Sequence, residues 1–153
     1  MIHGPGNKGN LNLLYMMVSK GIPYPLGSFG NKRSFVSIGN LAWIIRQIIE
    51  RDIPQGIYHL ADDDPISTII IIRMMSENLN RKERIWNIPK PLIRSLARTS
   101  DLLHFPLNSE RLKKLTESYV VSNQKIKSVL GITNLPITAT DGMKATLESF
   151  KID

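Results

Sequence analysis

The stretch His3-Gly-Pro-Gly-Asn-Lys-Gly-Asn-Leu11, residues 3–11, is the segment around which the rest of the chain is organised. Its glycines and proline predict a turn that lets the backbone approach a ligand closely. Asn10 is placed to cap an amphipathic helix in which Leu11, Tyr15 and Val18 share one face. A loop that opens into a helix N-terminus is a general anion-binding geometry, although alone it favours plain turn chemistry.

The length and composition are those of one globular domain. The chain has 153 residues, of which 42% are hydrophobic and 22% charged, so it can bury a core. It has no cysteine, which excludes disulfides and thiolate metal sites and fits a reducing compartment. No secretory signal is visible, and no apolar run approaches the roughly 20 residues that span a bilayer. We therefore expect a cytoplasmic protein without a membrane span.

The net charge is strongly positive, at +7 with a pI near 9.8. Such a charge suits contact with the phosphates of a nucleotide, a nucleic acid or an anionic membrane surface. The basic residues are nevertheless scattered in short groups, and no RNA-recognition or zinc-finger signature is present. A solvated basic surface is favoured over a nucleic-acid face. A basic nucleic-acid-binding module stays the alternative from another class.

Helical spacing and capping residues predict a mainly helical chain with short strands. The expected helices are residues 11–20, 41–51, 68–80, 92–103, 109–115, 124–130 and a last one that starts at 138 or 140 and ends at 150. The expected strands are residues 34–38, 56–61, 84–89 and 118–121. Asn40 is expected to cap the second helix and Ser67 the third. The four isoleucines at 69–72 favour a strand by propensity, but the length of the segment and its cap favour a helix.

Three further stretches follow the opening turn in a set order. They are Gly-Ile-Pro-Tyr-Pro-Leu-Gly at 21–27, Asn-Lys-Arg-Ser-Phe-Val-Ser-Ile-Gly-Asn-Leu at 31–41 and Gly-Ile-Tyr-His-Leu-Ala at 56–61. Together, from about residue 2 to 147, they resemble the C-terminal half of the extended short-chain dehydrogenase/reductase family, the nucleotide-sugar epimerases, dehydratases and 4-keto reductases. The resemblance implies an α/β fold, the predominantly helical substrate-binding half of such an enzyme, with the Rossmann N-terminal part missing.

Two motifs of that family are missing from this sequence. No glycine-rich dinucleotide fingerprint follows an apolar strand, and no tyrosine is followed four residues later by lysine; the tyrosines are Tyr15, Tyr24, Tyr58 and Tyr119. We therefore interpret residues 1–153 as one C-terminal substrate-binding domain, a fragment of a larger enzyme and inactive alone. The resemblance implies NAD or NADP in the parent, bound mainly by the missing N-terminal part, and no metal.

The resemblance also implies which residues meet the nucleotide. Asn10 and Leu11 match an Asn-Leu step that faces the nucleotide, although a simple helix cap explains them as well. Tyr24, Pro25 and Leu26 match the segment that runs beside the uracil, with a proline-stiffened connector as the equal alternative.

The strongest single candidate is Arg33. Its guanidinium has a planar fork that suits phosphate oxygens, and the family pattern of Arg before an aromatic residue and valine implies contact with the diphosphate. Arg111 is the candidate for a second phosphate-binding arginine, and Tyr119 follows in the strand expected next to it. His3 stands where the family has a tyrosine near the nicotinamide, which implies a structural or cofactor-contact histidine and no catalytic role. No catalytic or metal-binding residue is predicted.

The acidic run at residues 62–64 could attract a hard cation, but it lacks the spaced ligands of a calcium loop. We expect a solvated acidic turn there.

The resemblance implies a parent enzyme that binds a UDP-sugar and passes a hydride at C4 to or from a nicotinamide. The nearest branch is that of bacterial UDP-sugar 4-epimerases in surface-polysaccharide synthesis, and a UDP-4-keto-sugar reductase of the same family is the alternative. Expected partners are the UDP-sugar, the missing Rossmann part of the same polypeptide and a second copy in a homodimer. A third reading is an interaction domain without a ligand.

Overall fold

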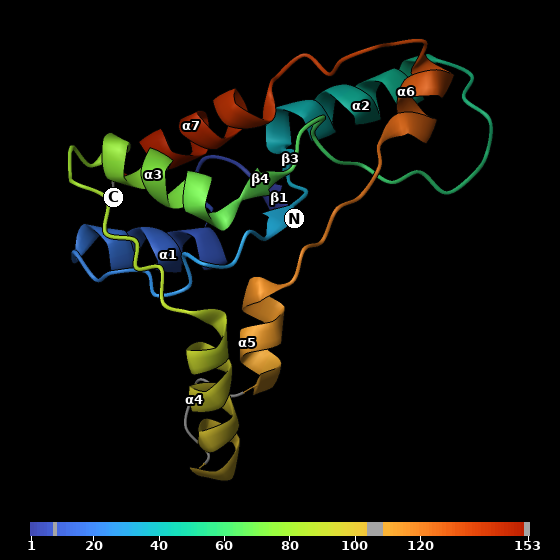
Figure 1. Cartoon of the computed structure of the whole chain (residues 1–153). Coiled ribbons are helices and arrows are strands. Elements are labelled where there is room, and N and C mark those ends of the chain that lie inside the picture. Colours follow the sequence, from blue (N-terminus) through green and yellow to red (C-terminus); the bar gives the residue numbers. More distant parts are fainter. Residues whose placement is uncertain (8, 104–108, 152–153) are drawn as a thin grey trace.

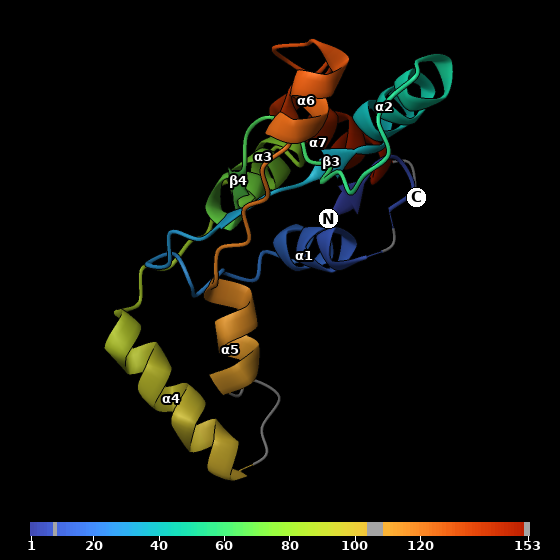
Figure 2. The ribbon, with the colours of Figure 1, turned by 90° about the vertical axis from the view of Figure 1, so that its right-hand side faces the viewer.

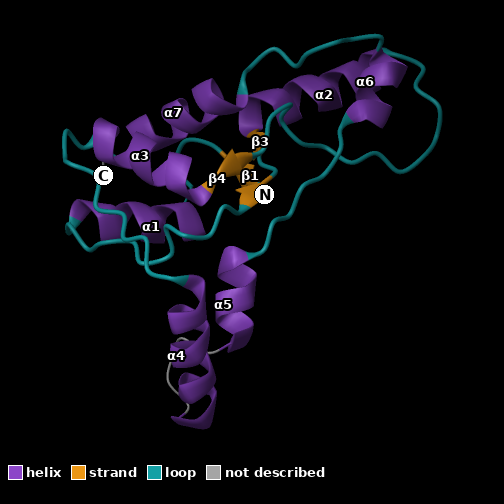
Figure 3. Cartoon of the chain, in the orientation of Figure 1, coloured by secondary structure: helices purple, strands orange, loops and turns teal. Residues whose placement is uncertain are grey.

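The structure is mainly helical, with four two-residue strands at its centre (Figures 1 and 3). The computed structural model describes residues 1–7, 9–103 and 109–151. In chain order the elements are β1 (Ile2–His3), α1 (Asn10–Ser19), β2 (Lys32–Arg33), β3 (Val36–Ser37), α2 (Ile38–Glu50), β4 (Ile66–Ser67), α3 (Thr68–Asn78), α4 (Lys90–Leu103), α5 (Ser109–Thr116), α6 (Gln124–Leu130) and α7 (Ala139–Ser149). The predicted fold class, helical with short strands, is confirmed.

The strands form two small pairs. β1 runs parallel to β3, with Ile2 beside Val36. β2 runs antiparallel to β4, with Arg33 beside Ile66. Within the described residues, β1 and β3 make a sheet of two strands and no third strand joins it. The opening turn therefore leaves the carboxyl end of a parallel strand, next to the start of α2.

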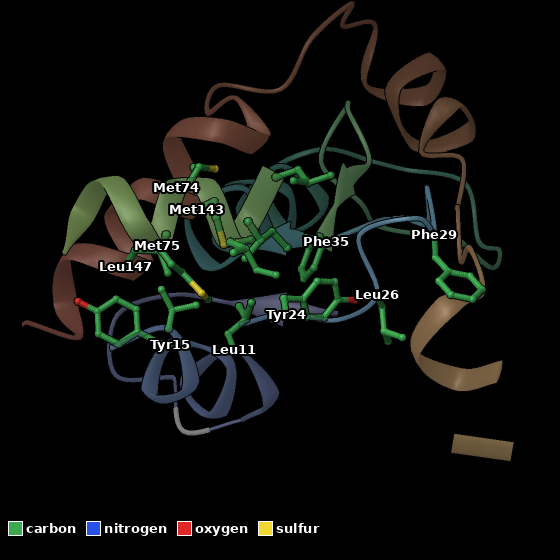
Figure 4. Packing of buried hydrophobic residues seen from close by; sticks show 14 of the residues in the cluster. Leu11, Tyr15, Tyr24, Leu26, Phe29, Phe35, Met74, Met75, Met143 and Leu147 are labelled. Atoms are coloured by element: carbon green, nitrogen blue, oxygen red, sulfur yellow. The ribbon is translucent and has the colours of Figure 1, made fainter. Parts of the chain in front are cut away.

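The main core lies where α3 packs against α1 on one side and α7 on the other (Figures 1 and 4). Ile71, Ile72 and Met75 of α3 are fully enclosed there. The Ser67 hydroxyl accepts a hydrogen bond from the Ile70 amide, which caps α3 as predicted. Helical spacing turns these apolar side chains toward the core, and burial outweighs the strand propensity of isoleucine.

A smaller cluster joins α2 to α6. It contains Ile44, Ile126, Leu130 and Leu135, with Trp43 packed at its edge. α6 ends at Gly131, which has the left-handed φ of +66°.

Helices α4 and α5 form an arm that projects from the body (Figure 2). Ile93, Ala97 and Leu112 are buried, and the two helices pack against each other. No helix in the described part of the chain combines the length and apolar character needed to cross a bilayer.

Two of the predicted caps are wrong. α1 is capped by Gly9, and Asn10 is its first helical residue without a capping side-chain bond. α2 begins earlier than expected, because Ser37 caps it by accepting a hydrogen bond from the Asn40 amide. Asn40 lies in the first turn of α2, and its completely buried side chain donates hydrogen bonds to Asp62 and to the Ile137 carbonyl.

Three of the predicted strands are also not formed. Residues 56–61 carry no strand, while 84–89 and 118–121 make only single bridges, from Ile85 to Tyr24, from Asn87 to Leu26 and from Tyr119 to Arg33. A strand needs a neighbour that continues the ladder. The described residues supply such a neighbour for only one or two positions.

Candidate functional site

A cavity of about 450 Å³ lies between α1, the segment 24–26, β2 and the start of α3. Such a volume falls in the range of small-molecule sites, which are mostly apolar with a few polar groups. Six of the residues predicted to bind substrate line it: Asn10, Leu11, Tyr24, Pro25, Leu26 and Arg33. Residues from four separate stretches of the sequence are thus brought to one hollow.

Backbone hydrogen bonds hold the segment 24–26 in place. The Tyr24 amide donates to the Arg84 carbonyl, and the Trp86 amide donates back to the Tyr24 carbonyl, both at 2.8 Å. The Gly27 amide donates to the Trp86 carbonyl at 3.0 Å. Tyr24 and Leu26 are buried and belong to the main hydrophobic cluster (Figure 4). This wall of the cavity is therefore rigid despite its loop character.

Arg33 supplies a positive charge to the cavity wall. Its Nη2 donates to the Lys114 carbonyl, and its Cζ lies 5.5 Å from the ring centroid of Tyr119. Among the described residues its Nε has no hydrogen-bond partner although it is buried. A buried, unpaired donor on a fixed guanidinium suits an anionic ligand oxygen, because leaving it unpaired is costly.

Polar neighbours of Arg33 complete the wall. Burial raises the pKa of the Tyr24 phenol, while a hydrogen bond with Thr68 and the charge of Arg33 act in the opposite direction. The phenol therefore stays neutral and can donate a hydrogen bond. Asn31 donates through Nδ2 to Thr68 Oγ1 at 2.9 Å and to the Leu115 carbonyl at 3.1 Å, and its buried Oδ1 has no partner in the described part.

The sequence analysis missed Thr68 and Asn31. Thr68 lines the cavity and follows the cap Ser67, and Asn31 is enclosed beside it. The one local signal for Asn31 is its place just before the Lys-Arg pair, which does not distinguish a site from a surface loop.

The other three residues predicted to bind substrate or cofactor are not among the described residues that line this cavity. Tyr119 is half exposed and reaches the site only through Arg33. Arg111 belongs to α5, but its side chain lies outside the described residues. His3 is 1% exposed, and its Nδ1 lies 2.8 Å from the Thr146 hydroxyl. A cofactor contact of His3 stays a prediction.

The backbone of the opening turn, by contrast, is accessible. Gly6 has φ +74°, and a Cβ added there would meet nothing within 4 Å. Ligands of parallel sheets bind outside the carboxyl ends of the strands, where this turn leaves β1. A dinucleotide could therefore approach the backbone of residues 4–6.

The prediction of a solvated acidic turn at residues 62–64 is wrong. Asp62 is 3% exposed and accepts hydrogen bonds from the Ser37 amide at 3.0 Å and from Asn40 Nδ2 at 2.7 Å. Burial alone would raise its pKa, but the neighbouring His3 ring and the hydrogen bonds from the Asn40 side chain and the Ser37 amide hold that pKa below its ordinary value. Only long-range contacts create this arrangement.

Asp63 makes a second network, to α6. Its Oδ1 lies 2.7 Å from Lys127 Nζ and also accepts from Asn123, while Oδ2 accepts from the Leu135 amide at 2.8 Å. Burial works against the charged form, yet these donors lower the Asp63 pKa. In the described part of the chain, no three His, Cys, Asp or Glu side chains are grouped to hold a metal ion.

Comparisons with known proteins agree with this geometry. No family model matches the sequence. UDP-glucose 4-epimerase from Vibrio cholerae is 32% identical over 157 residues, a match that covers 98% of this chain and 44% of the epimerase, in its C-terminal part. The chain thus spans less than half the length of this relative.

Solved structures share the fold over nearly the whole chain. dTDP-glucose 4,6-dehydratase from Bacillus anthracis, in complex with NAD, matches with a TM-score of 0.67 and 11% identity over 100% of this chain and 43% of that one. UDP-glucose 4-epimerase from Thermotoga maritima, with UDP-glucose, matches with a TM-score of 0.63 and 14% identity over 99% of this chain and 43% of that one.

Proposed function

We propose that this chain, which belongs to the extended short-chain dehydrogenase/reductase family of nucleotide-sugar epimerases and dehydratases, is the C-terminal substrate-binding domain of a larger enzyme. In that enzyme it holds a UDP-sugar. The whole enzyme uses NAD or NADP and works in the cytoplasm as a UDP-sugar 4-epimerase of surface-polysaccharide synthesis. A UDP-4-keto-sugar reductase is the second candidate, because both reactions need the same binding residues.

The observation that carries the proposal is the cavity in which six predicted residues meet. Arg33 offers its unpaired Nε to the diphosphate from the wall. Tyr24, Pro25 and Leu26 form a rigid edge against which the uracil packs, and Leu11 with Asn10 closes the side formed by α1. These groups bind and orient the substrate without moving a proton.

The cofactor, when bound, accepts or returns the hydride at C4 of the sugar. The residues of this chain would contribute the accessible backbone of the turn after β1, and a longer polypeptide would supply the rest of the cofactor site. By binding the UDP-sugar, this chain would hold the sugar in a fixed position relative to the turn after β1.

The chain also has a surface that fits the remaining part of such an enzyme. Sheets of parallel strands are normally covered on both faces and extended by further strands, yet β1 lacks a second neighbour in the described part. One face of α2 is apolar and exposed: Ile38 is 49%, Ile45 47% and Ile49 78% accessible. Ile44, on another side of α2, already packs against α6, so α2 has apolar side chains on a second face as well. We assign this face to the Rossmann part of the same polypeptide.

Titration of this chain with UDP, followed by calorimetry and by NMR, tests the nucleotide site. Saturable binding is expected, and Arg33→Ala should weaken it about tenfold because a charge-assisted hydrogen bond to the phosphate is lost. Uridine, which has no phosphate, should bind weakly to both proteins. Arg94→Ala on the exposed surface of α4 is the matched control and should bind as the unmodified chain does.

Duplex DNA is the second ligand in this experiment. Affinity for DNA that falls steeply with salt, with no effect of UDP and no effect of Arg33→Ala, would overturn the proposal in favour of a nucleic-acid-binding module.

A further inference from the structure

A second cavity, of about 220 Å³, lies on the other side of the segment that walls the nucleotide site. It is enclosed by the end of α1, the loop at residues 21–24, α3 and the segment 81–84. Tyr24 is the one described residue that lines both cavities. α1 and α3, which flank it, pack side by side (Figure 1). Nothing in the proposed function uses this space.

The cavity has a concentrated positive charge. Arg81, Lys82 and Arg84 line it, and none of the described lining residues is acidic. The acid within the same segment, Glu83, points elsewhere: its carboxylate pairs with Arg73 at 2.9 Å. The three cations are therefore not neutralised from within their own loop.

The donors of these side chains are largely available. Arg84 uses one nitrogen, Nη1, to donate to the carbonyl of Gly21, another lining residue, at 3.1 Å. A guanidinium has five N–H donors, so others remain. In the described part of the chain, the side chains of Arg81 and Lys82 make no hydrogen bond or ion pair.

A buried hydroxyl in the wall points to a ligand independently of the charge. Ser76 is 2% exposed and lines the cavity, and its Oγ has no hydrogen-bond partner among the described residues. A serine inside a helix usually bonds back to a carbonyl of the preceding turn, and an unpaired buried hydroxyl is costly. An acceptor in the cavity would remove that cost.

We propose that this cavity binds a small phosphorylated molecule, with Arg81, Lys82 and Arg84 around the phosphate and Ser76 as an uncharged donor. A phosphate monoester carries close to two negative charges at neutral pH and has three acceptor oxygens, so it matches three cations better than a carboxylate does. The apolar wall of Val18, Ile22 and Ile72 receives the carbon skeleton. Because sites for drug-sized ligands start near 300 Å³, the ligand is smaller than a nucleotide.

The test uses the full chain and two probes, inorganic phosphate and glycerol 3-phosphate, at constant ionic strength with chloride as the reference anion. Backbone amide shifts in an NMR titration report the place of binding. We expect saturable shifts at residues 18–24 and 76–84, and tighter binding of glycerol 3-phosphate because of its carbon skeleton. Arg81→Gln combined with Lys82→Gln should weaken binding about tenfold.

Two matched variants separate this site from the nucleotide site. Arg33→Gln and Arg94→Gln should each leave glycerol 3-phosphate affinity within about twofold, since neither residue lines the second cavity. Loss of binding in Arg33→Gln with no effect of the Arg81/Lys82 change would overturn the proposal, because the probe would then occupy the nucleotide cavity. Equal shifts with chloride, or no saturation, would overturn it as well. Neither result bears on the UDP titration, so the proposal of a nucleotide site and the proposal of this second site can be overturned independently.

Discussion

The Asp62 carboxylate lies 3.6 Å from Nε2 of His3, and neither side chain has any exposed surface. On its other side the imidazole meets Thr146, whose hydroxyl donates to the Gly142 carbonyl at 3.0 Å. His3 Nδ1 lies 2.8 Å from that hydroxyl, and Nε2 faces the carboxylate without a hydrogen-bond partner among the described residues. This buried pair ties β1 to the start of α2 and to α7.

Removing the Asp62 carboxylate should destabilise the fold strongly. Asp62→Ala leaves the Ser37 amide and the Asn40 side chain without their acceptor, and we expect a loss of about 3 kcal/mol in the free energy of unfolding. Urea denaturation followed by circular dichroism measures it. The exposed neighbour gives the control: Asp64→Ala should change the same quantity by less than about 0.5 kcal/mol. Equal effects of the two changes would contradict the assigned network.

Stability should fall in acid because of two carboxylates, the buried Asp62 and the partly buried Asp63. The pKa values of Asp62 and Asp63 lie below the ordinary 3.8 in the folded chain, so the unfolded chain binds protons more readily. The free energy of unfolding therefore rises with pH: the contribution is complete above the ordinary pKa and is lost as the pH falls through the folded values. Urea denaturation at pH values from about 2.5 to about 7, a range that spans the ordinary carboxyl pKa near 4, measures this slope.

Lys127→Met tests the part of that slope due to Asp63. Without the ammonium at 2.7 Å, the Asp63 pKa should move up toward its ordinary value, and the acid slope should become shallower. An unchanged slope would show that the other donors to Asp63 suffice.

Gly27 should tolerate no side chain. A Cβ there would lie 2.9 Å from the Trp86 carbonyl oxygen and would also overlap the side chains of Ile85 and Asn87. Gly27→Ala should therefore cost about 2 kcal/mol and weaken UDP binding by displacing the cavity wall. Gly30→Ala is the matched control, since nothing lies within 4 Å of its Cβ position. Thermal unfolding of both variants checks the difference.

Tyr119 should support nucleotide binding through Arg33 and not by direct contact. Tyr119→Ala removes the ring beneath the guanidinium, and UDP affinity should drop by about threefold. Tyr119→Phe keeps the ring and removes only the hydroxyl that bonds to Glu117, so it should bind UDP normally. Calorimetric titration of the two variants with UDP would distinguish them, and equal losses would instead implicate the hydroxyl.

The exposed face of α2 should make the isolated chain self-associate. Replacing Ile45 and Ile49 together by lysine should reduce association in sedimentation velocity while leaving the unfolding free energy within about 0.5 kcal/mol, because both side chains are largely accessible. Ile44→Lys, on the buried face, should instead unfold the protein. Unchanged association in the double variant would remove this face as an interface.

Features with a local cause could be predicted from the sequence. Ser67 and the isoleucines after it predict α3, the threonines at 138 and 140 predict the start of α7 to within two residues, and Gly131 predicts where α6 ends. Each depends on hydrogen bonds or on side-chain spacing within a few residues. The residues that meet in the cavity were predicted from the family resemblance. That resemblance rests on the order of several stretches along the chain, because no single motif is specific enough.

Features with a distant partner were decided by the tertiary structure alone. Asn40 looks like a helix cap and is instead a buried bridge between Asp62 and Ile137. Ser76 and Arg81 resemble ordinary helix and loop residues until folding brings them to one cavity. The segment 56–61 reads as a strand but lacks a ladder partner among the described residues. The reason is physical: burial, pairing and charge depend on neighbours in space, and a sequence lists only neighbours along the chain.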